Sequence, residues 1–200
     1  ISSNGDVIEG HHRIESAKGM GQSTVPAYVI DWVDTTKESE HLDSIIGLNN
    51  GNKAWSQLDY LKAFTNKSKD YNLVHKAYLN NYNTISVGNL IKMFFGKTSK
   101  DFKKGESSVK NYKFSLYLLK KISRLVTKYG KKNVQAYCIR EMINIAFIKA
   151  YDDYEALDFL FKEYEGLART SHPAATSIAR FKPLMELSLS QFNRGRDANN

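Results

Sequence analysis

The chain has 200 residues and a mass of 22.8 kDa, enough to bury a hydrophobic core in one large domain or two small ones. Hydrophobic residues make up 42% and charged residues 25%, with only 3 Pro and 12 Gly, which excludes collagen-like and low-complexity chains. The single cysteine, Cys138, excludes an internal disulfide and a cysteine-based zinc site. It lies in an apolar, helix-like run, which favours a buried thiol over a nucleophile and fits a reducing, cytoplasmic compartment.

The net charge of +8 is distributed unevenly along the chain. Residues 1–50 carry three Lys/Arg and eight Asp/Glu, residues 51–150 carry twenty and five, and residues 151–200 carry six and eight. A strongly basic centre predicts a polyanionic partner, most simply DNA. The alternative is a solvated, lysine-rich helical surface without a specific ligand.

No run approaches about 18 uninterrupted apolar residues, so we expect no membrane-spanning segment and no membrane partner. Because the chain begins with Ile1, we also expect it to be a fragment or a processed product.

Residues 1–35 have the pattern of an α/β segment. A turn at Asn4–Asp6 precedes a short strand at Val7-Ile8, which Gly10 ends. A helix is predicted from His12 to Lys18, followed by a glycine-rich turn. The β-branched and aromatic run Val25–Ile30 predicts a second strand.

The sequence after Glu38 has the pattern of helices joined by short polar turns. Ser56 and Asp59 have the spacing of a helix N-terminal cap. Further along, apolar residues recur at three- and four-residue spacing, which is typical of helices with one face in the core. Helices are predicted near 57–64, 71–82, 86–95, 111–129, 132–150, 153–167 and 174–192.

The run from Val7 to Val29 resembles the central box of the ParB N-terminal domain, in the ParB/sulfiredoxin superfamily. That box is a strand, a Gly-x-x-Arg that opens a helix with a small residue four positions later, a glycine turn, and Val-Pro in the next strand. The matching residues are Gly10, Arg13, Ala17, Gly21, Val25 and Pro26. The resemblance implies a ParB-like unit that is truncated at its N-terminus.

The resemblance also implies a nucleotide-phosphate site, with CTP or ATP and Mg as cofactors. The residues that would bind the phosphates are Gly10, His11, His12 and Arg13, at a helix start that offers unpaired N–H groups. A second family motif, Glu-Asn-x-x-Arg, is matched here by Asn49 alone. The departures at Leu48 and Asn52 argue against nucleotide hydrolysis.

Catalysis and metal binding have few candidates in this segment. Glu9 is the only acidic residue near the predicted phosphates, so it is the one weak candidate for a catalytic group. Neighbouring residues on a helix point about 100° apart, so His11 and His12 are not expected to share a metal ion. The catalytic residues therefore stay open, and no metal ligands are predicted.

The resemblance extends to a helix-turn-helix unit over residues 71–95, with its turn at Asn83-Thr84. On the second helix we expect Ser86, Asn89 and Lys92 to face outward, where Asn can contact an adenine edge and Lys a phosphate or guanine. The alternative is an ordinary amphipathic helix in a helical bundle. The lysines of the following connector would add phosphate contacts: Lys97, Lys100, Lys103 and Lys104.

Several tyrosines lie on the predicted helices that follow the connector. Their spacing favours packing at the edge of the core, with stacking on bases as the alternative. These residues are Tyr112, Tyr117, Tyr129 and Tyr137.

The predicted fold is α+β and predominantly α-helical. It comprises a partial ParB-like α/β domain (1–52), a helix-turn-helix-like segment (53–96), a basic connector (97–110), a C-terminal helical bundle (111–192) and a frayed tail (193–200). The expected function is DNA binding of the partition or plasmid/phage regulator type, and a homodimer is compatible with it. Two alternatives remain open: a nucleotide-dependent phosphotransferase, hydrolase or nuclease of the same superfamily, or a helical protein-interaction module.

Overall fold

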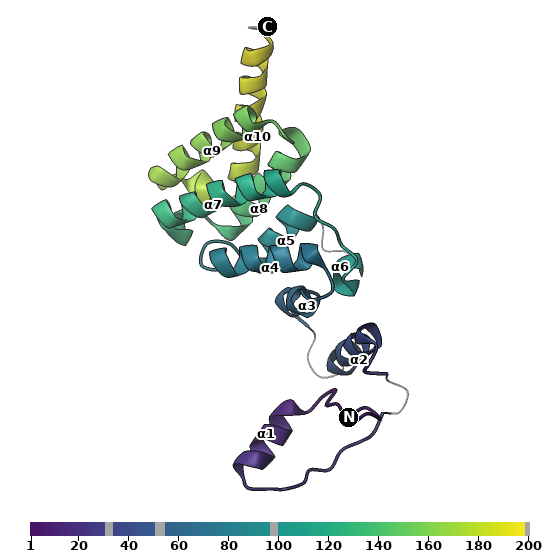
Figure 1. The fold of residues 1–200 in the computed structure, drawn as a ribbon. Helices are drawn as coiled ribbons and strands as arrows, with labels where there is room; N and C mark the ends of the chain where they lie inside the picture. The colour runs from purple at the N-terminus through teal and green to yellow at the C-terminus, as the bar shows by residue number, and fades with distance from the viewer. Residues whose placement is uncertain (31–33, 51–54, 97–99, 199–200) are drawn as a thin grey trace. The chain divides into compact units, whose positions relative to one another are not determined.

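The computed structural model describes residues 1–30, 34–50, 55–96 and 100–198, and helices dominate it (Figure 1). The chain divides into two compact units, residues 1–59 and residues 60–200, with the boundary inside helix α3 (Gln57–Ala63). The prediction of a predominantly helical chain is confirmed.

None of the helices in the described ranges combines the length and the apolar character that crossing a membrane requires.

The first unit contains α1 (His11–Gly19), α2 (Glu38–Asn50) and the start of α3. Gly10 precedes α1 with φ of 98°, a backbone conformation that residues with a Cβ rarely adopt. The chain leaves α1 through Gly21, where φ is 74°. The predicted helix of this segment is therefore present, with a glycine in the left-handed region on each side.

The predicted strands are not formed in the described part of the first unit. Its only β pairing is an isolated parallel bridge between Ser2 and Ile30, in which Ile30 N donates to Ile1 O at 2.8 Å. A strand needs a neighbouring strand to satisfy its backbone N–H and C=O groups. Among the described residues, Val25–Ile30 has only this bridge and the bond from Ile1 N to Tyr28 O at 2.8 Å, and Val7-Ile8 forms no bridge. The Tyr28 side chain is 92% exposed. The predicted α/β unit is therefore not supported.

The cap predicted at Ser56 is confirmed. Ser56 N donates to Asp59 Oδ2 at 2.9 Å, and Asp59 N donates back to Ser56 Oγ at 3.3 Å. This reciprocal pair satisfies backbone N–H groups at the start of α3.

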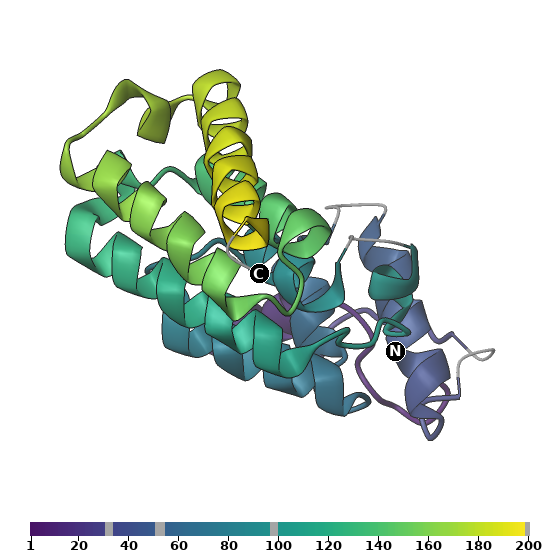
Figure 2. The same ribbon diagram turned by 90° about the horizontal axis from the view of Figure 1, so that it is seen from above.

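The second unit is built from helices that follow one another closely along the chain. Figures 1 and 2 show α9, α7 and α4 side by side in that order, while α10 packs on α8 and α9. The terminal helix continues to Asp197, through most of the tail predicted to be frayed. The bounds are α4 (Lys69–Asn81), α5 (Val87–Phe95), α6 (Lys100–Lys104), α7 (Tyr112–Asn133), α8 (Ala136–Lys149), α9 (Tyr154–Arg169), a 3-10 turn (Pro173–Thr176) and α10 (Ile178–Asp197).

Helix α5 lies in the core of this unit, in contact with α4, α7 and α8. Leu90, Ile91 and Phe94 are fully buried, and Ser115 of α7 donates a hydrogen bond to Met93 O at 2.8 Å. Because three helices cover α5, apolar residues occupy more than one stripe of its surface.

An aromatic cluster anchors the segment that the sequence predicts to be a polar connector. Phe102, on the short helix α6, is 1% exposed, and its ring stacks on Tyr71 with centroids 5.4 Å apart. Tyr71 Oη donates to Phe102 O at 2.8 Å. Phe95 and Phe64 complete the cluster, with ring centroids 4.9 and 5.5 Å from that of Tyr71. The segment is thus held by its one aromatic residue, among lysines.

Cys138 lies on α8 and is completely buried, as predicted. Burial raises the pKa of its thiol to about 11, and Glu141 adds to the increase. A buried thiol with this pKa carries almost no thiolate near neutral pH, so a nucleophilic role is not supported.

Candidate functional site

Three of the predicted nucleotide-phosphate residues, Gly10, His12 and Arg13, border a cavity of about 800 Å³ within the first unit, whereas His11 is exposed and does not line it. Glu9, Gly10, His12 and Arg13 line it, together with Leu48 of α2. Helix α1 has no side-chain cap at its N-terminus, which leaves its first N–H groups to other acceptors. In the described part of the chain, Arg13 makes no ion pair, whereas Glu15 pairs with Lys18 at 3.2 Å.

Two predicted site residues, the Asn49 side chain and Lys97, lie outside the described residues. Within the described ranges, no group of three or more His, Cys, Asp and Glu side chains is placed to hold a metal ion.

The outward-facing surface predicted on α5 is only partly present. Asn89 is 1% exposed, and its Nδ2 donates to Ala136 O at 2.8 Å, so the prediction that it faces outward is wrong. The physical reason is that α8 covers this side of α5. Ser86 is exposed and caps the helix by accepting from Asn89 N at 3.3 Å, while Lys92 is half-buried. A helix enclosed in this way cannot enter a DNA groove without unfolding its surroundings.

The connector lysines that the structure describes are exposed to solvent. Lys100, Lys103 and Lys104 are exposed on α6. The Lys103 ammonium lies 5.8 Å from the centre of the Tyr60 ring, a cation–π distance. These lysines remain available for phosphate contacts, and none of them lines the cavity of the first unit or the groove described below.

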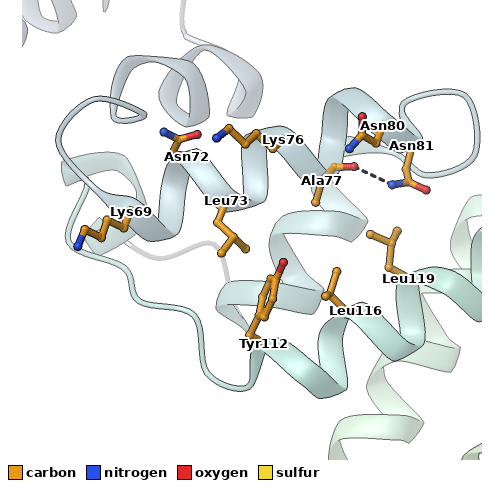
Figure 3. A pocket seen from close by; sticks show the side chains of 10 residues that line it. All are labelled: Lys69, Asn72, Leu73, Lys76, Ala77, Asn80, Asn81, Tyr112, Leu116 and Leu119. Carbon is orange, nitrogen blue, oxygen red and sulfur yellow. Dashed lines mark hydrogen bonds between the residues drawn. The ribbon is translucent and has the colours of Figure 1, made fainter.

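A groove of about 470 Å³ lies between α4 and α7 (Figure 3). Its floor is apolar, formed by Leu73 and Ala77 of α4 and by Leu116 and Leu119 of α7. Lys, Asn and Tyr side chains complete the lining: Lys69, Asn72, Lys76, Asn80, Asn81 and Tyr112. No acidic residue is among them. The sequence pattern does not predict this groove.

Hydrogen bonds tie α4 to its neighbours at both ends of the groove. At one end, Ser123 of α7 donates to Asn81 Oδ1 at 2.8 Å, and its Oγ lies 3.0 Å from that of Thr84. At the other end, Val109 N donates to Asp70 Oδ2 at 2.8 Å. These contacts hold α4 against its neighbours at Asp70 and at Asn81.

The charges around α7 are divided between its two flanks. On the flank toward α9, Lys121 pairs with Asp158 at 2.6 Å and Lys128 with Glu165 at 2.7 Å. The hydrogen bond from Lys128 holds the pKa of Glu165 below its usual value. Residues 60–132 contain seventeen Lys/Arg and only three Asp/Glu, so α9 supplies the acids for this flank.

Within the described ranges, the flank toward α4 has no comparable neutralisation. Lys113 and Lys120 are exposed on α7 at three- and four-residue spacing from the groove residue Leu116, although they do not line the groove themselves. Lys69 and Lys76 stand across the groove on α4. Among the described residues, none of these four lysines forms an ion pair. We call them the rim lysines.

Only one of the four tyrosines considered in the sequence lies in the groove. The hydroxyls of Tyr117 and Tyr129 donate to Asp158 and Glu165 of α9, and that of Tyr137 donates to Thr176 O. These three therefore pack at the edge of the core, as predicted. Tyr112 lines the groove instead and is 41% exposed.

Models of protein families, curated proteins and solved structures were all compared with the chain, and none of them matches it. The interpretation of the groove therefore depends on its own residues and their chemistry.

Proposed function

We propose that the chain binds DNA through the basic surface formed by α4 and α7. The observation that supports this proposal is the division of charge on α7. Acids on α9 pair with the lysines of one flank, whereas the rim lysines on the other flank have no acidic partner among the described residues. Unpaired lysines on two adjacent helices create a positive potential that attracts phosphates.

This mode of binding differs from that of a helix-turn-helix protein. Because α5 is covered by its neighbours, contacts come from lysines on α4 and α7, which meet phosphates and carry no base information. Affinity should therefore depend strongly on salt and weakly on sequence.

The proposal is tested by reversing two rim lysines and comparing binding with that of a charge-matched control. In the variant Lys76→Glu with Lys120→Glu, we expect affinity for a fluorescein-labelled DNA oligonucleotide to fall about tenfold to a hundredfold in low salt. The slope of log affinity against log salt should become shallower by about 2, because each lost phosphate contact contributes about 0.9. Fluorescence anisotropy over a KCl series measures both quantities.

The control variant, Lys162→Glu with Lys182→Glu, has the same change in net charge on exposed residues of α9 and α10. We expect it to lose less than about threefold in affinity. Equal losses in the two variants would indicate a general effect of net charge, and salt-independent binding would favour the protein-interaction module.

A second candidate function is nucleotide-phosphate binding in the first unit. The cavity bordered by Gly10, His12 and Arg13 supports it, together with the absence of an ion pair on Arg13 among the described residues. The ligand would be CTP or ATP, with Mg carried by its phosphates.

If Arg13 binds a triphosphate, Arg13→Ala should weaken nucleotide binding about tenfold to a hundredfold, since a charge-assisted hydrogen bond contributes about 1.5–3 kcal/mol. The melting temperature should barely change, because Arg13 has no ion pair to lose within the described part of the chain. Calorimetric titration with CTP and ATP, together with thermal melting of both proteins, measures the two effects. A wild-type chain that binds neither nucleotide would remove this candidate.

A further inference from the structure

We propose that the groove between α4 and α7 accommodates unpaired bases, so that the chain prefers single-stranded to duplex DNA. This inference rests on the proposed function and concerns the same surface. Three features of the groove support it: the position of Tyr112, the apolar floor, and the arrangement of amides and lysines along the sides.

Tyr112 provides an aromatic surface inside the groove. Figure 3 shows its ring rising from α7 toward Leu73 of α4. Its ring centroid lies 6.0 Å from that of Phe94, which is fully buried, so the core supports the tyrosine from one side. A base can stack on such a ring whatever its identity, because every base has a π face. The hydroxyls of the other three tyrosines are hydrogen-bonded to α9 or to Thr176 O, and these residues do not line the groove.

The floor of the groove also matches an unpaired base better than a duplex. Leu73, Ala77 and Leu116 are half-buried in the absence of a ligand, so their remaining apolar surface is in water. A duplex presents phosphates on its outside and keeps its base faces stacked within, so it cannot cover such a floor. An unpaired base can, and the volume of about 470 Å³ lies within the range of about 300–1,000 Å³ that encloses small organic groups.

The sides of the groove provide donors at intervals along its length. Lys69 and Lys76 line the groove and are seven residues apart on α4, about 10 Å along the helix. Lys113 and Lys120 have the same spacing on the exposed surface of α7, beside the lining residue Leu116 but outside the lining itself. The side-chain amides of Asn72 and Asn80 make no hydrogen bond within the described residues, unlike that of Asn81, whose Nδ2 donates to Ala77 O at 2.9 Å. A strand lying in the groove can thus place phosphates at the rim lysines and base edges at the two asparagines.

The test compares a labelled oligothymidylate of twelve nucleotides with a twelve-base-pair duplex, using the full chain and fluorescence anisotropy. We expect the wild type to bind the single strand at least tenfold more tightly than the duplex. Tyr112→Ala should weaken single-strand binding about tenfold and change duplex binding less than twofold. Tyr112→Phe should bind like the wild type, because it keeps the ring.

Tyr82→Ala is the matched control, since Tyr82 is 57% exposed and does not line the groove. It should bind like the wild type, and circular dichroism melting identifies any variant that is unfolded. Duplex binding equal to or tighter than single-strand binding would overturn the inference while leaving the proposed function intact. An equal loss of affinity for the single strand and the duplex in Tyr112→Ala would also overturn the inference. Binding of thymidine monophosphate as tight as that of the oligonucleotide would overturn it as well. Binding of neither DNA would instead remove the proposed function itself.

Discussion

Replacement of Phe102 by alanine is expected to lower the free energy of unfolding of the second unit by about 3–5 kcal/mol. The ring is 1% exposed and contacts the rings of Tyr71 and Phe95, with centroid separations of 5.4 and 5.7 Å. Its removal deletes buried apolar surface and leaves a cavity between α4, α5 and α6, which the neighbouring rings can fill only in part.

Urea unfolding followed by circular dichroism measures this loss. Phe192→Ala provides the comparison, because Phe192 is half-buried on α10 and stacks on a single ring, that of Phe159. We expect that variant to lose less than about 2 kcal/mol, in line with its smaller buried area. If Phe102→Ala cost no more than Phe192→Ala, the aromatic cluster would not be the anchor of the connector.

Gly105→Ala is expected to destabilise the second unit by about 2–5 kcal/mol. Its φ is +77°, and an added Cβ would lie 2.4 Å from Cδ1 of the Phe64 ring. The left-handed backbone alone costs about 1–3 kcal/mol for a residue with a Cβ, and displacing a buried ring adds a similar amount. Phe64 is 3% exposed and contacts the Tyr71 ring, so it has little room to move.

Variants at two other glycines separate the backbone contribution from the contribution of the steric clash. Gly96 has φ of +86°, and a Cβ added there would have nothing within 4 Å, so Gly96→Ala should lose only the backbone contribution, about 1–3 kcal/mol. Gly166 lies within α9 with equally open surroundings, so Gly166→Ala should stabilise the unit by about 0.5–1 kcal/mol. In urea unfolding, Gly105→Ala should therefore lose the most free energy of unfolding, Gly96→Ala less, and Gly166→Ala should gain stability. A loss in Gly105→Ala no larger than in Gly96→Ala would contradict the predicted clash.

Local pattern was sufficient to locate most helices of the second unit. The stripe that includes Phe114, Leu118 and Ile122 is buried as its spacing predicted, because helix periodicity reports which face meets the core. The cap at Ser56 was equally readable, since its partner Asp59 is three residues away.

Features that depend on distant parts of the chain were missed. Asn89 has a polar side chain, and nothing near it in sequence shows that α8 covers it and supplies Ala136 O. Phe102 stands among lysines, and its burial depends on Tyr71, thirty-one residues earlier. The run Val25–Ile30 has strand-forming residues, yet composition alone cannot provide the neighbouring strand that it would need.

The groove illustrates the same limit. Leu73 and Leu116 each fit an ordinary amphipathic pattern on their own helix, and only the packing of α4 and α7 on α5 brings them to one floor. The charge count did indicate the basic region. It could not show that α9 would neutralise one flank of α7 and leave the other without acidic partners among the described residues.

The burial of Cys138 gives the chain an intrinsic reporter of its own opening. Alkylating reagents react with the thiolate, and a thiol with a pKa of about 11 inside the core offers them neither charge nor access. Modification therefore requires a local unfolding event in which α8 separates from its neighbours. Because the sequence has a single cysteine, each modified chain gains one mass increment at one known position. The rate of alkylation of the unaltered chain thus reports the opening of this part of the core, with no introduced label.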